Sequence, residues 1–208
     1  KISLENMVQH ALSVRLGVKK ALLVVDMPKG SYNKESQALK NAKIIIKKTR
    51  CDAIKLENYK NNHKTLKYLV KNKIPVMGHI GYTPQFKKRF KLEGQSKREA
   101  HALLEEAKLI ERAGAFSIVL ECLTSYAAKL ITKNIKIPTI GIGSSSYCDG
   151  QVLVTDDMLG LSGFYPKFVK KYANLDRIIA KATKKYTRDV KLKKFPSKKN
   201  FLNGSKLR

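Results

Sequence analysis

The feature that most constrains the fold is a repeated pairing of a short apolar run with a longer amphipathic stretch. The apolar runs do not alternate with polar residues, which is typical of strands buried on both faces of a parallel sheet. Six runs of strand length are expected, at residues 21–26, 51–57, 74–79, 115–122, 137–143 and 151–156. The pattern predicts an α/β fold whose parallel sheet is covered by helices.

Helices are expected between these runs, on the basis of helical periodicity and capping residues. The clearest helix follows Ser96 and Glu99, which have the spacing of a capping box, and ends at Gly114. Ser3 is the expected N-cap of the first helix. The other helices are expected over residues 3–16, 34–48, 62–72, 125–133 and 175–188. Such helices serve as the long connections that parallel strands require.

Two architectures fit this order: an open doubly wound sheet, or a (βα)8 TIM barrel. No G-x-G-x-x-G turn or P-loop sequence follows any strand. Six strands cannot close the usual eight-stranded barrel, which takes ~250 residues. If the fold is a barrel, we therefore expect the first two strands to be missing from this chain, as two βα units before Lys1.

The net charge of +27, from 43 Lys and Arg against 16 Asp and Glu, indicates one of two things. It predicts an anionic partner such as nucleic acid or a phospholipid surface, or it reflects lysine spread over solvated helix faces. Lysine occurs in nearly every expected helix and concentrates only at residues 87–98 and 181–208. The even spread favours the second interpretation and makes nucleic acid an improbable partner.

The location is expected to be cytoplasmic. No apolar run approaches the ~20 residues of a membrane span, and the first ten residues contain no apolar core of a signal sequence. Cys51, Cys122 and Cys148 are odd in number and far apart, which fits neither a disulfide framework nor a zinc site. We expect reduced thiols.

Polar or ionisable side chains stand at the ends of four consecutive apolar runs. The first run ends on Asp26, the second carries Lys55 and Glu57, the third ends on His79 and the fourth on Glu121. The carboxyl ends of parallel strands converge on one mouth in a barrel, where active sites are built. These residues are therefore the candidates for a catalytic site.

Each candidate also has a structural explanation. Asp26 precedes a Met-Pro pair and could simply shape the turn. Lys55 and Glu57 could form a weak surface salt bridge. His79 could be a hydrogen-bonded core histidine. Glu121 could be a paired structural carboxylate instead of a base. The residues alone leave these alternatives open.

Several sequence blocks carry a resemblance to a known family. They are "AIKLEN", "PVMGHIGYTPQ", "GAFSIVLEC", "IPTIGIG", "CDGQVLVTDDMLGL" and "PKFVKKY". Together they resemble the ketopantoate hydroxymethyltransferase family, in the family's order, from about residue 3 to residue 173. The G-H-I-G-x-T-P-Q and C-D-G-Q-V-L-V segments are the most specific of them.

The resemblance implies a (βα)8 barrel, usually assembled into a decamer, that needs magnesium. The implied reaction moves a one-carbon unit from 5,10-methylenetetrahydrofolate, the co-substrate, to the keto acid 3-methyl-2-oxobutanoate. The product is 2-dehydropantoate, in pantothenate synthesis. A carboxylate-lined site suits Mg²⁺, a cation that prefers oxygen ligands.

The resemblance also implies a role for each candidate residue. Asp26 and Glu57 are the implied metal ligands. Asp26, Lys55 and His79 are the implied substrate-binding residues, and Lys55 binds the keto acid. Glu121 is the implied general base, which removes the C3 proton.

The chain departs from the family pattern at two places. A G-D-S segment, whose aspartate is a magnesium ligand in the family, is absent, and Ser144 and Ser145 replace a small Ala-Gly pair. We expect residues 1–188 to form a partial catalytic barrel and residues 189–208 a basic, loosely ordered tail. The alternative is a catalytically degenerate basic scaffold that binds nucleic acid.

Overall fold

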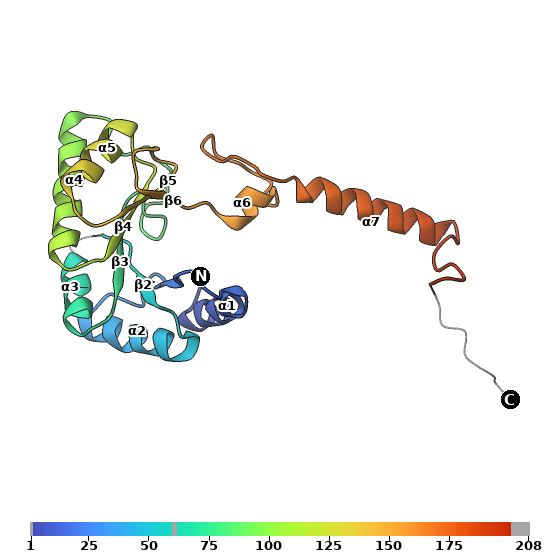
Figure 1. The fold of residues 1–208 in the computed structure, drawn as a ribbon, viewed down its shortest axis with the longest axis horizontal. Helices are drawn as coiled ribbons and strands as arrows, with labels where there is room; N and C mark the ends of the chain where they lie inside the picture. Colours follow the sequence, from blue (N-terminus) through green and yellow to red (C-terminus); the bar gives the residue numbers. More distant parts are fainter. Residues whose placement is uncertain (1, 60–61, 201–208) are drawn as a thin grey trace. The chain divides into compact units, whose positions relative to one another are not determined.

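The computed structural model describes residues 2–59 and 62–200. The chain divides into two compact units, residues 1–152 and residues 153–208. The first unit holds the whole sheet and every candidate site residue (Figure 1).

The sheet has six strands, all parallel, in the order β1-β2-β3-β4-β5-β6. Their bounds are β1 Val24–Asp26, β2 Ala53–Lys55, β3 Val76–Gly81, β4 Ser117–Glu121, β5 Thr139–Ile142 and β6 Gly150–Gln151. A doubly wound sheet reverses its strand order at a switch point, and this sheet does not. The predicted α/β fold with a parallel sheet is confirmed, and the strand order is that of a barrel wall.

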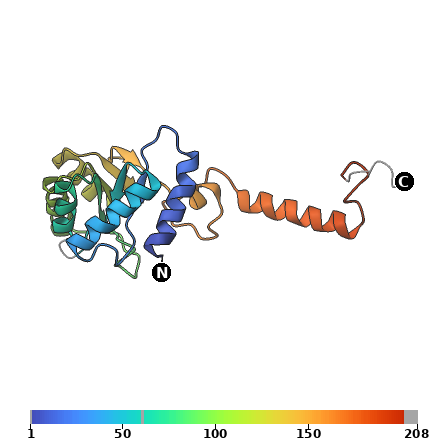
Figure 2. The same ribbon diagram turned by 90° about the horizontal axis from the view of Figure 1, so that it is seen from below.

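The helices of the first unit are α1 Leu4–Gly17, α2 Glu35–Thr49, α3 His63–Lys71, α4 Lys97–Arg112 and α5 Ser125–Asn134. Figure 1 shows α2 to α5 along the outer side of the sheet, and Figure 2 shows the same layering from below. Their apolar stripes, such as Ala100, Leu104 and Ala107 of α4, are buried against the strands. The connections thus pass over one face of the sheet, as in a barrel.

Both expected N-caps are present. The Asn6 backbone N–H donates to Ser3 Oγ at 3.1 Å, and the Glu99 N–H donates to Ser96 Oγ at 3.1 Å. The capping box at Ser96 is wrong in one detail, because the Glu99 carboxylate accepts from the Gln95 N–H at 2.9 Å instead. Each cap still satisfies an amide that has no partner within the helix.

Several expected strand ends are wrong, including that of the second strand, which ends at Lys55 and leaves Glu57 outside it. The strand expected at 151–156 is limited to Gly150–Gln151, and α6 (Thr155–Leu159) begins where the strand was expected to continue. Asp156 and Asp157 stand in the first turn of α6, where acidic side chains favour a helix. The third strand runs two residues past His79, to Gly81.

Glycines beside His79 allow close packing. A Cβ added at Gly78 would lie 2.5 Å from Ile110 Cγ2, so this glycine lets α4 approach β3. Gly81 has φ +94°, and a Cβ there would lie 2.2 Å from the Glu121 carbonyl oxygen. The glycines therefore seat β3 against α4 and β4, and hold His79 in place.

The inner face of the sheet lines a mostly apolar cavity of about 560 Å³, together with side chains of α1. Strand residues that face it include Val24, Lys55, Met77, Val119 and Ile140. In a closed barrel such inward residues form layers in a filled core. This face therefore has the character of a barrel interior.

The second unit holds α6 and α7 (Leu175–Lys191). Gly160, at φ +76°, ends α6, and the Tyr172 N–H donates to the Met158 carbonyl at 2.8 Å. Helix α7 continues three residues beyond the expected end at 188. Residues 201–208 of the expected basic tail lie outside the described residues.

Two simpler features complete the fold. Cys51, Cys122 and Cys148 are buried free thiols, which agrees with the expected reduced state. In the part of the chain that the structure describes, no helix has the length and apolar character needed to cross a membrane.

Candidate active site

Four candidate side chains form a continuous line across the carboxyl ends of β1 to β4. Asp26 Oδ2 lies 3.0 Å from Lys55 Nζ, and Lys55 Nζ lies 3.3 Å from His79 Nδ1. His79 Nε2 lies 3.1 Å from Glu121 Oε2. The strand register places Asp26 beside Lys55 and Glu121 beside Gly81, two residues beyond His79. The prediction that these strand ends converge is confirmed.

His79 is the buried centre of this line, with 2% of its surface exposed. Burial lowers its pKa, only partly opposed by the Glu121 carboxylate, so the imidazole is neutral near pH 7. The Lys55 ammonium has only donors, which makes His79 Nδ1 the acceptor and leaves the proton on Nε2. That proton faces Glu121, although the oxygen lies off the N–H direction and the contact is poorly aligned.

Glu57 lies beyond the end of β2 and is also buried, with 3% of its surface exposed. Burial raises its pKa from 4.5 to about 7, partly offset by the Gln85 N–H, which donates to Oε2 at 3.0 Å, and by the Lys55 charge. Asp26 and Glu121 add negative charge nearby. The alternative that Glu57 forms a surface salt bridge with Lys55 is wrong, because Glu57 is buried and Lys55 pairs with Asp26.

Gln85 is a structural link that the sequence did not single out as a site residue. Its Nε2 donates to the Met27 carbonyl at 3.0 Å, and its Oε1 accepts from the Tyr32 hydroxyl at 2.7 Å. With its N–H on Glu57, one residue joins the ends of β1 and β2 to the loop after β3. The only signal in the sequence was its place in the G-H-I-G-x-T-P-Q block.

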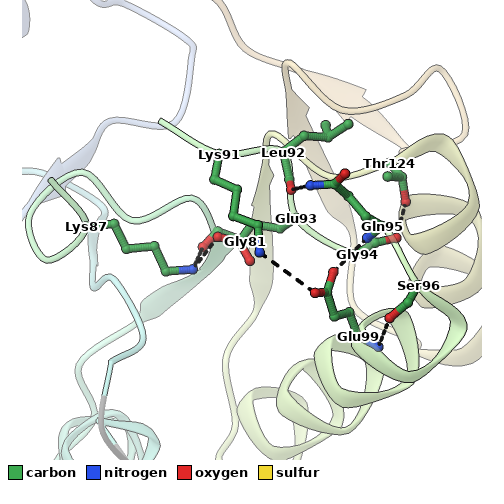
Figure 3. Close-up of polar contacts among 10 residues, drawn as sticks. All are labelled: Gly81, Lys87, Lys91, Leu92, Glu93, Gly94, Gln95, Ser96, Glu99 and Thr124. Carbon is green, nitrogen blue, oxygen red and sulfur yellow. Dashed lines mark hydrogen bonds and ion pairs between the residues drawn. The ribbon is translucent and has the colours of Figure 1, made fainter. Parts of the chain in front are cut away.

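The loop between β3 and α4, residues 82–96, is tied down by polar contacts (Figure 3). Lys87 Nζ lies 2.8 Å from the Gly81 carbonyl oxygen and 2.7 Å from Glu93 Oε1. Thr124 Oγ1 donates to the Gly94 carbonyl at 2.7 Å. Part of the basic stretch at 87–98 therefore orders a loop at the mouth of the site.

Asp26 and Glu57 both line a cavity of about 600 Å³ in the first unit. Residues from the loop after β1 and the loop after β3 line it as well: Pro28, Lys29, Pro84, Gln85 and Phe86. Pockets that hold drug-sized ligands span roughly 300–1,000 Å³. The two carboxylates thus stand in a space large enough for a small-molecule ligand.

The donor set suits a hard divalent cation. Mg²⁺ is commonly held by one or two carboxylates, with water and substrate oxygens completing its shell. Asp26 and Glu57 are such a pair, and Glu57 is a buried carboxylate whose ionised form a cation would stabilise. Among the described residues, no group of three or more His, Cys, Asp and Glu side chains is arranged to hold a metal.

Comparison with known proteins gives the family. The model of ketopantoate hydroxymethyltransferase matches residues 1–198. This chain belongs to the ketopantoate hydroxymethyltransferase family. It is 54% identical over 200 residues to the 3-methyl-2-oxobutanoate hydroxymethyltransferase of Pelagibacter ubique, covering 96% of this chain and 78% of that protein. It is 45% identical to the enzyme of the same name from Pseudothermotoga lettingae, covering 97% of this chain and 78% of that protein.

Among solved structures, a putative phosphonomutase from Burkholderia cenocepacia is similar to this ketopantoate hydroxymethyltransferase family member with a TM-score of 0.55. The match covers 92% of this chain and 79% of that one, at 10% identity. An identity this low supports likeness of fold alone.

Ser144, one of the two serines that depart from the family pattern, fits its surroundings. Ser144 Oγ donates to the Leu120 carbonyl at 2.6 Å and accepts from the Leu123 N–H at 3.0 Å. These bonds bracket Glu121 and Cys122, which has φ +55°. Ser144 therefore braces the turn that follows Glu121 in this family member.

Proposed function

We propose that this protein is a 3-methyl-2-oxobutanoate hydroxymethyltransferase of pantothenate synthesis. The proposed reaction transfers a one-carbon unit from 5,10-methylenetetrahydrofolate to the keto acid and gives 2-dehydropantoate. The observation that carries the proposal is the line from Asp26 through Lys55 and His79 to Glu121, because it places the Lys55 ammonium and the Glu121 carboxylate on opposite sides of one buried histidine. Membership of the family supports the same activity.

Glu121 is the proposed general base. Its carboxylate stands at the end of β4 beside the His79 Nε2–H and takes the proton from C3 of the keto acid. Neutral His79 stands 3.1 Å from the carboxylate without supplying the positive charge that would weaken it as a base. The same histidine is a proposed substrate-binding residue, although it lines neither of the two cavities described above.

Lys55 is the proposed electrostatic partner of the substrate. Its ammonium is held between Asp26 and His79, so it is positioned before the keto acid arrives. Removal of the C3 proton moves negative charge onto the 2-oxo oxygen. A preorganised cation stabilises that charge more in the transition state than in the ground state.

Asp26 and Glu57 are the proposed magnesium ligands. When bound, the ion would supply Lewis acidity toward the carboxylate and 2-oxo oxygens of the keto acid. Asp26 would reach the ion while pairing with Lys55, and Gln85 would keep Glu57 aimed into the cavity. Glu121 is left to handle the proton.

For the fold, we propose that the six strands belong to a (βα)8 barrel closed by two further βα units that this chain lacks. The sequential strand order and the apolar inner face support closure, with β1 and β6 as the edges that the two units would join. We also propose residues 1–188 as the barrel domain, a cytoplasmic location and a homo-oligomer. The encoded sequence before Lys1 tests closure, since it should contain the two units and the G-D-S segment.

The activity is tested by proton exchange in heavy water with magnesium and 3-methyl-2-oxobutanoate, without folate. Loss of the C3 proton signal in the NMR spectrum reports enolisation directly. Exchange that needs both magnesium and Glu121 is the expected result. If a folded protein neither binds the keto acid nor exchanges its proton, the proposed function is wrong.

A further inference from the structure

The cavity that contains Asp26 and Glu57 has a second, chemically different lining. Beside the carboxylates stand the Phe86 ring, the Lys29 ammonium and two prolines, Pro28 and Pro84. A short keto acid held at the carboxylates cannot fill about 600 Å³. The remaining lining is aromatic, apolar and cationic, which suits a flat ring that carries an anionic group.

Phe86 is held rigidly in an aromatic cluster. Its ring stacks on Tyr59, with centroids 4.5 Å apart and planes at 6°, and meets Tyr32 edge-on at 6.2 Å. The Tyr32 hydroxyl is fixed by Gln85, and the Phe86 N–H donates to the Thr83 carbonyl at 2.9 Å. A ring fixed in this way can stack a ligand ring at small cost in conformational entropy.

Lys29 supplies the cation at this part of the cavity. Its Nζ lies 5.3 Å from the centre of the Phe86 ring, and its side chain is exposed. A ring that stacks on Phe86 would displace the ammonium from the aromatic surface. The flexible lysine could then pair with a carboxylate on the same ligand.

We propose that Phe86 and Lys29 form the binding subsite for the reduced folate, with the folate ring system against Phe86 and the glutamate tail on Lys29. This inference rests on the proposed function. The one-carbon donor must lie next to the keto acid for its carbon to reach C3, and this lining adjoins the metal-binding carboxylates. The donor is also the reactant that has flat rings and an anionic tail.

The test measures tetrahydrofolate binding by calorimetry for Phe86→Leu and Phe86→Tyr. Leucine keeps the apolar contact and removes the aromatic ring, so binding is expected to weaken about 3–10-fold. Tyrosine restores a ring, and binding is expected to return to within about twofold of wild type. Equal affinity for all three proteins would overturn the proposal, as would a wild-type protein that does not bind tetrahydrofolate.

The cation is tested with mono- and triglutamyl tetrahydrofolate. Lys29→Met is expected to weaken binding of the triglutamyl form more than binding of the monoglutamyl form, by roughly 3–10-fold. This difference should shrink at high salt. Lys34→Met is the matched control, an exposed lysine on the same loop that is outside the cavity lining within the described residues. Equal losses for Lys29 and Lys34 would overturn the role of Lys29.

Proton exchange of the keto acid separates this inference from the proposed function. Without folate, Phe86→Leu and Lys29→Met are expected to exchange C3 within about twofold of wild type, since Glu121 is intact. Normal exchange with unchanged folate binding contradicts only the subsite. Absence of exchange and of keto-acid binding in wild type contradicts the proposed function itself.

Discussion

At the scale of single residues, the site depends on burial acting on acids and bases in opposite ways. Burial keeps His79 neutral and raises the pKa of Glu57 to about 7, whereas Lys55 contacts both Asp26 and His79. A carboxylate that is costly to ionise in the empty protein gains most when a cation arrives. As a proposed magnesium ligand, Glu57 is therefore expected to couple metal binding to pH.

The first prediction concerns magnesium affinity. Because a proton competes with the ion for Glu57 below about pH 7, affinity is expected to rise about tenfold between pH 6 and pH 8. Titration calorimetry measures this. Glu57→Gln should bind magnesium more weakly, with an affinity that is flat across this range. A flat profile for the wild-type protein would contradict the role of Glu57.

The same group sets the pH dependence of stability without metal. The folded-state pKa of about 7 lies above the ordinary 4.5, so between these values the folded protein binds more protons than the unfolded chain. The contribution of Glu57 to the free energy of unfolding therefore falls as the pH rises through this window. Urea unfolding should show this fall in wild type and a smaller one in Glu57→Gln. A larger fall of the unfolding free energy in Glu57→Gln than in wild type would refute this role of Glu57.

At the scale of elements, the ends of β3 and β4 lie so close together that position 81 has no room for a side chain larger than the hydrogen of glycine. Its positive φ and its distance from the Glu121 carbonyl are independent obstacles to a Cβ. Gly30 shares the positive φ, at +91°, but a Cβ there would meet nothing within 4 Å. Comparison of substitutions at Gly81 and Gly30 therefore separates the cost of backbone strain from the cost of steric conflict.

Gly81→Ala is therefore expected to be more destabilising than Gly30→Ala. Strain alone should cost Gly30→Ala about 1–2 kcal/mol of unfolding free energy. Gly81→Ala should lose roughly 1–3 kcal/mol more, because β4 must move away. Chemical denaturation measures both. Equal losses of unfolding free energy would show that the ends of β3 and β4 relax freely and that the close contact with Glu121 is unimportant.

At the scale of the whole molecule, apolar runs and caps were enough to predict the parallel sheet, because burial on both faces leaves a direct record in the sequence. The convergence of Asp26, Lys55, His79 and Glu121 also followed from their positions at strand ends. Gln85 was missed as a link, since its three bonds join segments far apart in the chain. Helix α6 was missed because its apolar lead-in is also typical of a strand.

The measurement that tests the central claim most directly is keto-acid proton exchange in Glu121→Gln against wild type, with saturating magnesium. The control is Glu111→Gln, a carboxylate that accepts from the Ile137 N–H at 3.3 Å, before β5 begins and so near the amino ends of the strands. Glu121→Gln is expected to exchange at least about 100-fold more slowly, and Glu111→Gln at the wild-type rate. Exchange by Glu121→Gln at the wild-type rate would show that another group removes the C3 proton.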